Sequence, residues 1–369
     1  MWKTEEGSTG RLIQLCIGYF SLYTVFMVLN KYFTRKVGGV PFMTELEFTV
    51  YSTLGGTVLC ILVVLALKWY RLQSNGSVEL AGVKVPREYL YIIPSGICTA
   101  VVIPTTTLLF ALAPTVMVAT VLMRGSVIAM GRLVDEAQIR QGILKKKVYW
   151  EENVGVLVAI LAVALQIFWP ADNAAKKQAE PATINAAFYW VLGAYVLAYL
   201  VRIYIMNYFK NTRAKGVKLD NKGFFGIEQI SATSTLILVA AGLFLWARSV
   251  AKPPELVAAF HDTIAAPHGE WPWAALVGTV FGFVAFFSVF LFLFKGRTAT
   301  FAVLVNRLTS LIAGTMATIV AWQAFLPDKN PKPPDWVALG LILVAIWFLG
   351  RSEKKRARET LAAHELAKA

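Results

Sequence analysis

The feature that most constrains this 369-residue chain is a succession of long, nearly uncharged apolar runs. A helix needs roughly 20 apolar residues to cross a bilayer, and about ten stretches of the sequence reach that length. Hydrophobic residues make up 57% of the chain and charged residues 16%, against about 25% charged residues in soluble domains. These values exclude a soluble globular protein and leave little of the chain for a separate soluble domain.

The apolar runs predict an all-α integral membrane protein with ten transmembrane helices. The predicted spans lie near residues 12–33, 42–67, 89–111, 114–134, 150–169, 186–208, 224–247, 272–294, 298–322 and 335–350. The first run is longer than the roughly 7 to 15 residues of a signal-peptide core, so we expect it to be retained as a span.

The formal net charge of +14 would suggest a nucleic-acid partner in a soluble protein, but basic residues of membrane proteins collect in cytoplasmic loops. On the side that carries both termini the predicted topology places 24 Lys and Arg, against 9 on the other side. We therefore expect cytoplasmic termini, contact with membrane lipid and no nucleic-acid partner. The host would be a bacterial inner membrane or a eukaryotic endomembrane.

The two halves of the chain resemble each other. At an offset of 183 residues, Glu45 falls on Glu228 and Arg124 on Arg307; at an offset of 176, Tyr23 falls on Tyr199. Five spans is an odd number, so the second half would be inverted relative to the first, as in many secondary transporters. Chance alignment of apolar helices is the alternative.

This repeat divides the chain into four parts. They are a first five-helix repeat over 1–170, a linker over 171–185, a second five-helix repeat over 186–350 and a basic cytoplasmic tail over 351–369. The tail is a candidate helix whose basic residues would touch lipid headgroups.

Arg124 and Arg307 are the most informative residues. Each follows the predicted start of its span by about ten residues, which at a rise of 1.5 Å per residue is about 15 Å into the membrane. Buried arginines are costly there, and the acidic residues within spans lie near span ends. The pair therefore predicts a central site for an anionic ligand, which guanidinium groups bind well. The alternative is that backbone carbonyls and water satisfy each arginine.

Several polar and aromatic residues accompany the arginines and extend the predicted substrate-binding site. They are Asn306, Ser126, Thr309, Asn30, Tyr19, Tyr23, Tyr195 and Tyr199. The tyrosines fall on one face of each first helix and would stack on a base or sugar. Helix packing is the alternative for the tyrosines and for the small polar residues.

Four charged residues near span ends have two interpretations each. Lys31 and Arg202 either face the cavity or reach the membrane surface along their aliphatic stems. Glu45 and Glu228 either gate opposite mouths alternately or are carboxylates at helix starts, which the helix dipole favours. The phenylalanine-rich run over 281–294 is expected mainly to face lipid.

Motifs for other chemistry are absent from the sequence. It has no phosphate-binding loop of ATP-driven pumps, and its histidines, His261, His268 and His364, lie outside the predicted spans. The three cysteines have no metal-ligand or C-x-x-C spacing. We expect no cofactor, no metal and no enzymatic activity.

Three stretches resemble the drug/metabolite transporter superfamily, in particular its nucleotide-sugar and triose-phosphate translocators. Residues 27–32 read Met-Val-Leu-Asn-Lys-Tyr, similar to the Asn-Lys ending of the first helix in these carriers. Residues 122–125 and 303–308 resemble the phosphate-binding and substrate-binding motifs of the fourth and ninth helices. The resemblance implies that Asn306 and Arg307 contact the substrate and that Arg124 contacts its phosphate.

We therefore expect a secondary-active, alternating-access transporter, acting as an antiporter on an anionic phosphorylated or nucleotide-linked metabolite, with a homodimer as one possible assembly. The alternatives are an exporter of amino acids or drugs from the same superfamily, a membrane-embedded lipid-phosphate transferase, and a non-transporting receptor or scaffold.

Overall fold

The computed structural model describes residues 9–37, 40–80, 82–144, 147–169, 186–214, 216–217, 219–292, 294, 299–328 and 330–366. Eight helices in these residues are long and apolar enough to cross a membrane. The chain is therefore an α-helical, multi-pass integral membrane protein. The predicted linker over 171–185 lies outside the described residues.

Ten long helices occupy the positions of the ten predicted runs. They are α1 (Thr9–Thr34), α2 (Glu45–Ala66), α3 (Tyr89–Leu112), α4 (Val116–Arg140), α5 (Trp150–Phe168), α6 (Ala186–Asn211), α7 (Asn221–Ser249), α9 (Trp271–Phe292), α10 (Ala299–Ala324) and α11 (Pro333–Leu366). Two of them, α5 and α10, are outside the eight candidate spans.

Small elements that the sequence did not predict connect the long helices. They are α8 (Glu255–Ala265) and the strands β1 (Lys36–Val37), β2 (Val40–Pro41), β3 (Ser77–Leu80) and β4 (Val83–Pro86). The strands form two antiparallel hairpins, β1 with β2 and β3 with β4. The strands are too short to produce a distinct periodic pattern in the sequence.

Local side-chain bonds determine where several helices begin. A capping box opens α2, with Thr44 and Glu47 each bonding the other's backbone N–H. The side chain of Thr115 accepts from Val118 at the start of α4, and that of Asp220 accepts from Gly223 at the start of α7. These bonds satisfy N–H groups that a helix start leaves without a partner.

Two helices run past their predicted ends because ion pairs continue them. In α4 the helix ends at Arg140, and Glu136 bonds both Arg132 and Arg140 at 3.0 Å, one turn away on each side. As predicted, the described part of the tail is helical, and it continues α11 to Leu366. Its Lys355 and Arg356 pair with Glu151 and Glu152 of α5, so these two cations contact protein where the sequence suggested lipid headgroups.

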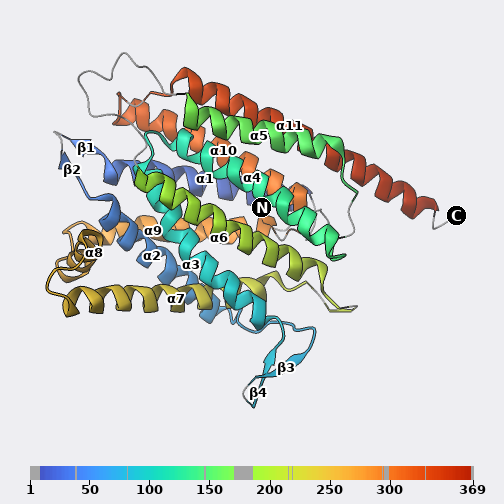
Figure 1. The fold of residues 1–369 in the computed structure, drawn as a ribbon, viewed down its shortest axis with the longest axis horizontal. Coiled ribbons are helices and arrows are strands. Elements are labelled where there is room, and N and C mark those ends of the chain that lie inside the picture. Colours follow the sequence, from blue (N-terminus) through green and yellow to red (C-terminus); the bar gives the residue numbers. More distant parts are fainter. Residues whose placement is uncertain are drawn as a thin grey trace.

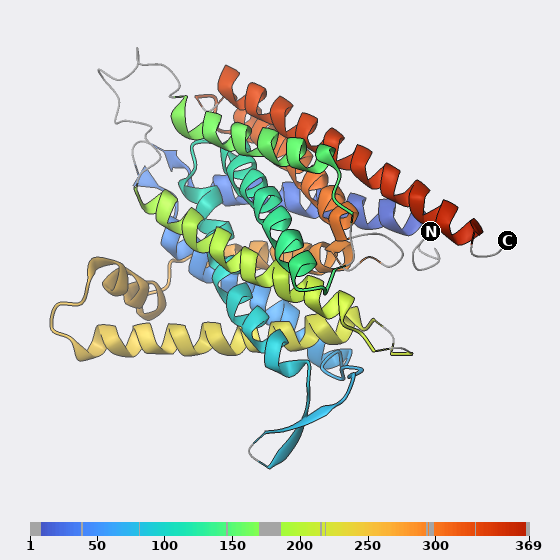
Figure 2. The same ribbon diagram turned by 45° about the vertical axis from the view of Figure 1, so that its right-hand side comes forward.

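Helices that are far apart in the sequence pack against one another (Figure 1). α2 packs on α9 and α3 on α7, while α5 packs on α11. α1 contacts α9 and α10, and α6 contacts α3 and α4. α1 begins and α11 ends at the same end of the bundle (Figure 2), as an even number of crossings requires.

Glycines let α2 and α9 approach closely. A Cβ added at Gly55 would lie 1.8 Å from the carbonyl oxygen of Ala275, and one at Gly278 would lie 1.9 Å from that of Ser52. No side chain fits at either position, so the two backbones are in direct contact.

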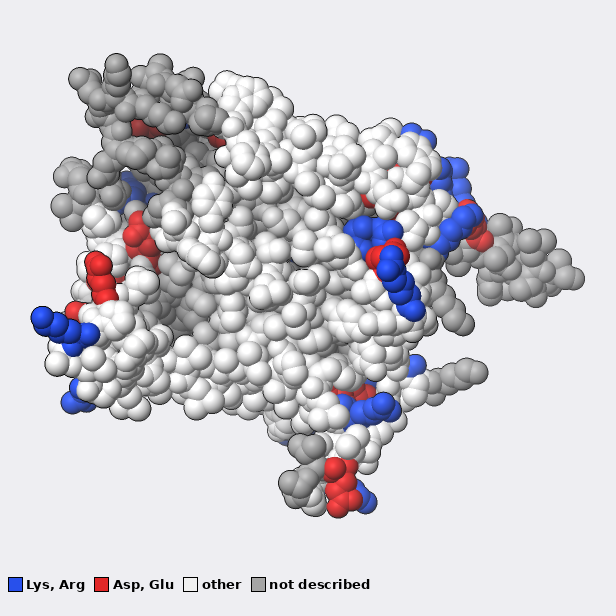
Figure 3. Space-filling model, in the orientation of Figure 1, with Lys and Arg blue, Asp and Glu red and all other residues white. Residues whose placement is uncertain are grey.

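The outer surface suits a bilayer. Large apolar side chains such as Leu157, Leu238 and Trp190 are exposed, and the face in Figure 3 has an uncharged middle with charged side chains gathered towards its ends. Lipid chains can cover such a band while water and headgroups solvate the charged ends.

Candidate functional site

Arg124 reaches the centre of the bundle from α4. Its side chain is buried, with 3% exposed. Nη2 donates to the Tyr23 hydroxyl at 2.6 Å, and Nη1 donates to the Tyr195 hydroxyl at 3.2 Å. The partners are neutral, and in the described residues Nε has no hydrogen-bond acceptor. Arg124 thus keeps its charge, and its Nε–H among other donors, for a further group.

Arg307 approaches the same place from α10. It is fully buried, and its guanidinium carbon lies 5.2 Å from the centre of the Tyr199 ring. The rings of Tyr195 and Tyr199 are 4.7 Å apart, and those of Tyr19 and Tyr23 are 5.2 Å apart. The arginines therefore contact one tyrosine cluster, consisting of these four residues from α1 and α6.

A buried ion pair lies beside the tyrosine cluster. Nε and Nη2 of Arg202 on α6 each donate to a carboxylate oxygen of Glu228 on α7 at 2.8 Å. The Ser95 hydroxyl of α3 also donates to Glu228, at 2.6 Å. The guanidinium of Arg202 lies 5.9 Å from the ring centre of Tyr199, so the pair adjoins the cluster.

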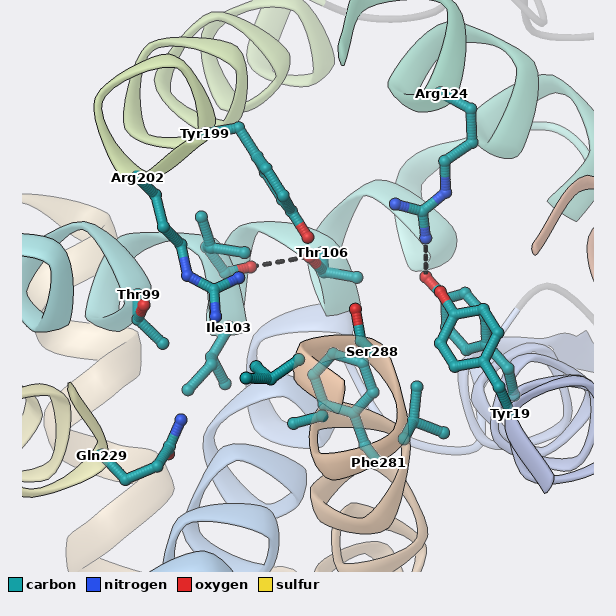
Figure 4. Close-up of a pocket in the computed structure, with 15 residues that line it drawn as sticks. Tyr19, Thr99, Ile103, Thr106, Arg124, Tyr199, Arg202, Gln229, Phe281 and Ser288 are labelled. Carbon is teal, nitrogen blue, oxygen red and sulfur yellow. Dashed lines mark hydrogen bonds between the residues drawn. The ribbon is translucent and has the colours of Figure 1, made fainter. Parts of the chain in front are cut away.

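A cavity of about 60 Å³ opens between these groups (Figure 4). Its lining consists of Tyr19, Tyr23, Thr99, Val102, Ile103, Thr106, Arg124, Tyr199, Arg202, Gln229, Phe281, Val284, Ala285, Ser288 and Val289. Arg124 and Arg202 extend into it from different helices (Figure 4). The volume accommodates a few water molecules, so a sugar phosphate would require the helices to separate.

Four predicted site residues line this cavity together with Arg202, which the sequence left undecided between cavity and membrane surface. They are Arg124, Tyr19, Tyr23 and Tyr199. Tyr195 and Arg307 do not line the cavity, but each contacts a residue that does: Tyr195 accepts from Arg124, and Arg307 lies against the Tyr199 ring. Arg202 is buried and bonded to Glu228, so it does not extend to the membrane surface.

Asn30 and Lys31 bind the end of α3. The Asn30 amide donates to the carbonyl of Thr107 at 3.2 Å, and the Lys31 ammonium donates to those of Ala111 and Ala113 at 3.1 and 2.5 Å. A helix C-terminus leaves its last carbonyls without partners, and a cation is favourable there. The structure thus places this pair outside the cavity and buries Lys31, which does not extend to the membrane surface.

The remaining small polar residues also lie outside the cavity lining. The Asn306 amide donates to Ser288, which does line the cavity, at 3.2 Å. The Thr309 hydroxyl donates to the Val305 carbonyl of its own helix at 2.8 Å. Ser126 is half-buried on α4. Asn306 alone of these three bonds a residue that lines the cavity.

The two predicted gating carboxylates occupy different settings. Glu45 opens α2 and is half-buried. Glu228 lies in the third turn of α7, is fully buried and pairs with Arg202. Glu228 lies farther from the start of its helix than the predicted span suggests, because α7 begins at Asn221, three residues before that span.

Several lining residues were missed from the sequence. They are Thr99, Thr106, Gln229, Phe281 and Ser288. Phe281 was expected to face lipid, yet its ring stacks on that of Phe26 with centroids 4.4 Å apart. The one signal in the sequence was polarity within an apolar run, as at Ser288, and that signal alone does not distinguish cavity from packing.

One further ion pair lies outside the spans and away from the cavity. Arg213 donates to Glu88 at 2.8 Å, and Ser74 and Asn75 also donate to this carboxylate. Burial opposes ionisation of Glu88, but these hydrogen bonds and the Arg213 charge outweigh it and lower the pKa of Glu88. The network connects the β3–β4 region to the end of α6.

Comparisons with known proteins do not assign a family. No protein-family model and no curated protein matches the chain. A solved structure described only as "Crystal structure of protein" aligns over 94% of this chain and 99% of that chain, at 15% identity and a TM-score of 0.49. A likeness at that level carries no argument. In the described residues, no group of three or more His, Cys, Asp or Glu side chains is arranged to hold a metal ion.

Proposed function

We propose that this protein is a secondary carrier that moves an anionic, phosphorylated or nucleotide-linked metabolite by alternating access. The observation that carries the proposal is Arg124, a buried cation that lines a central cavity and bonds only neutral hydroxyls within the described residues. Burying a cation without an anion is costly in a membrane protein. A bound anion would offset that cost by accepting charge-assisted hydrogen bonds.

The pattern of helix contacts supports an inverted repeat of two five-helix halves. Exchanging α1 with α6, α2 with α7, α3 with α9, α4 with α10 and α5 with α11 converts each major contact into another observed one. The α2–α9 contact becomes α7–α3, the α1–α9 contact becomes α6–α3, and the α1–α10 contact becomes α6–α4. Folds of this kind place their substrate at the interface of the repeats.

The residues around Arg124 and Arg307 follow the same relation. Tyr23 and Tyr199 are repeat-related, and each contacts the arginine of its own half, Arg124 and Arg307 respectively. A site assembled from both halves suits alternating access, because rocking one half against the other exposes the site to either side in turn. We place both termini in the cytoplasm on the distribution of basic residues.

Substrate would replace the tyrosine hydroxyls on Arg124. An anionic oxygen accepts a stronger bond from guanidinium than a neutral hydroxyl does, and the rings of the tyrosine cluster and Phe281 offer stacking surfaces for a base or sugar. The cavity must widen for this. Transport follows if the ligand favours the widened states, since a ligand shifts conformations only by differential affinity.

A thermal-shift screen tests the proposal. Purified protein is heated with nucleotide sugars, nucleotides, sugar phosphates, prenyl phosphates and amino acids in turn, and a ligand that binds the folded state raises the melting temperature. We expect stabilisation by a phosphorylated ligand, and loss of that stabilisation in Arg124→Gln and Arg307→Gln. Arg140→Gln is the control, because Arg140 is an exposed residue at the end of α4.

Three outcomes would contradict the proposed anion carrier. Undiminished ligand stabilisation in folded Arg124→Gln would remove this arginine from the site. Stabilisation by amino acids alone would favour the exporter, and stabilisation by prenyl phosphates with turnover would favour a lipid-phosphate transferase.

A further inference from the structure

Two arginines line the cavity, and their guanidinium groups bond different kinds of partner. Arg124 bonds neutral tyrosine hydroxyls, whereas Arg202 gives two donors to Glu228. The repeat does not require this ion pair, because the position related to Arg202 by the 176-residue offset is the apolar Phe26. The carboxylate that pairs with a cavity arginine, Glu228 on Arg202, therefore has no counterpart in the first half of the chain.

The two carboxylate oxygens of Glu228 occupy Arg202 in the way a phosphate or a carboxylate of a ligand would. Both kinds of anion take parallel bonds from a guanidinium. Entry of a ligand's anionic group onto Arg202 would separate Glu228 from its cation, leaving a fully buried carboxylate. An isolated buried carboxylate is unfavourable and becomes neutral by binding a proton.

We propose that Glu228 is a built-in competitor for Arg202, and that the anionic group of the substrate displaces it and causes it to bind one proton from water. The carboxylate becomes a neutral carboxylic acid, whose hydroxyl can donate and whose carbonyl can still accept from Ser95. Anion and proton then occupy the carrier together. This inference rests on the proposed function, since it requires an anion in the cavity.

In the described residues around Glu228, the cation that pairs with its carboxylate is Arg202. Around this carboxylate lie Ser95 and Cys98 of α3 and Arg202 of α6. Of the other helices on α7, α9 contains no charged residue, and α2 carries charge only at Glu45 and Glu47 in its first turn. α8 carries Glu255, His261 and Asp262 and follows the opposite end of α7.

The test is calorimetric titration of inorganic phosphate into the purified full-length protein, in two buffers of different ionisation enthalpy. Comparing the buffers counts the protons bound with phosphate. Protons exchanged by phosphate itself are common to all variants, so differences belong to the protein. We expect wild type to bind about one proton more than Glu228→Gln, and Glu228→Gln to bind phosphate about tenfold more tightly because Arg202 is no longer occupied.

Glu88→Gln is the matched control. It alters another buried Arg–Glu pair, which lies outside the cavity, with side chains 7% and 1% exposed against 6% and 0% for Arg202 and Glu228. We expect its phosphate affinity and proton count to equal those of wild type. Ser95→Ala is a second variant for the case that Glu228→Gln does not fold. Losing the Ser95 donor loosens Glu228, so phosphate binds several-fold more tightly with the proton count retained.

Weaker phosphate binding in Glu228→Gln or Ser95→Ala would overturn the inference, as would an unchanged proton count in Glu228→Gln, because the ion pair would then be purely structural. If phosphate binds wild type and no longer binds Arg124→Gln, such a result overturns the inference about Glu228 and leaves the proposed function intact. Phosphate binding that does not depend on Arg124 overturns both.

Discussion

At the scale of single residues, the buried cations of this protein differ in the groups that accept their hydrogen bonds. Arg202 has a carboxylate, Lys31 has helix-end carbonyls, and Arg124 has hydroxyls. These partners differ in how readily a ligand can replace them. Hydroxyls give up a guanidinium to an anion most easily, because an ionised acceptor makes the stronger bond.

Tyr23→Phe tests this replacement. The change removes the 2.6 Å bond to Arg124 and should lower the stability of the empty protein by about 2 kcal/mol, the usual value for a hydrogen bond to a charged group. With a phosphorylated ligand bound, the loss should be smaller because the anion supplies the acceptor.

Melting temperatures with and without ligand measure the difference. Tyr189→Phe, on an exposed ring of α6, is the control and should leave both temperatures unchanged. An equal loss with and without ligand would mean that Tyr23 and the ligand do not share Arg124.

At the scale of elements, the helices are positioned by contacts that the sequence pattern does not display. Gly55 and Gly278 bring α2 and α9 into backbone contact. The ion pairs of Glu136 with Arg132 and Arg140 stabilise the part of α4 that extends beyond the apolar run. Apolar length predicts where a helix crosses the membrane. Small residues and ion pairs then decide which helices touch and where each one ends.

Gly278→Ala should destabilise the protein by about 1 to 3 kcal/mol, because the added methyl overlaps the Ser52 carbonyl and forces α2 and α9 apart. Gly242→Ala is the matched control, since a Cβ there meets nothing within 4 Å and alanine favours a helix. Thermal unfolding in detergent compares them. A Gly278→Ala protein as stable as Gly242→Ala would contradict the close contact.

At the scale of the whole molecule, helices from distant parts of the chain together line a cavity of about 60 Å³. This volume is too small for a metabolite, so the proposed transport requires one group of helices to move against another. The charge of Arg124 should make such movement slow when the site holds no anion, because the charge is then closed off from water on both sides without compensation.

Anion exchange in liposomes tests that expectation. Vesicles preloaded with a phosphorylated ligand identified by the thermal-shift screen should take up labelled ligand much faster than empty vesicles, at least tenfold. Arg124→Gln should abolish this uptake. Equal uptake into empty and preloaded vesicles would contradict obligatory exchange.

The sequence alone determined the class of the protein and most helix positions, since span length and helix period are local properties of the chain. It also singled out Arg124 and Arg307, because charges in apolar runs are rare. Only the tertiary structure decided that Arg202 pairs with Glu228, that Lys31 binds the end of α3 and that Phe281 lines the cavity. The reason is physical: these partners lie on different helices, and which side chains meet depends on how the helices pack rather than on any one run of sequence.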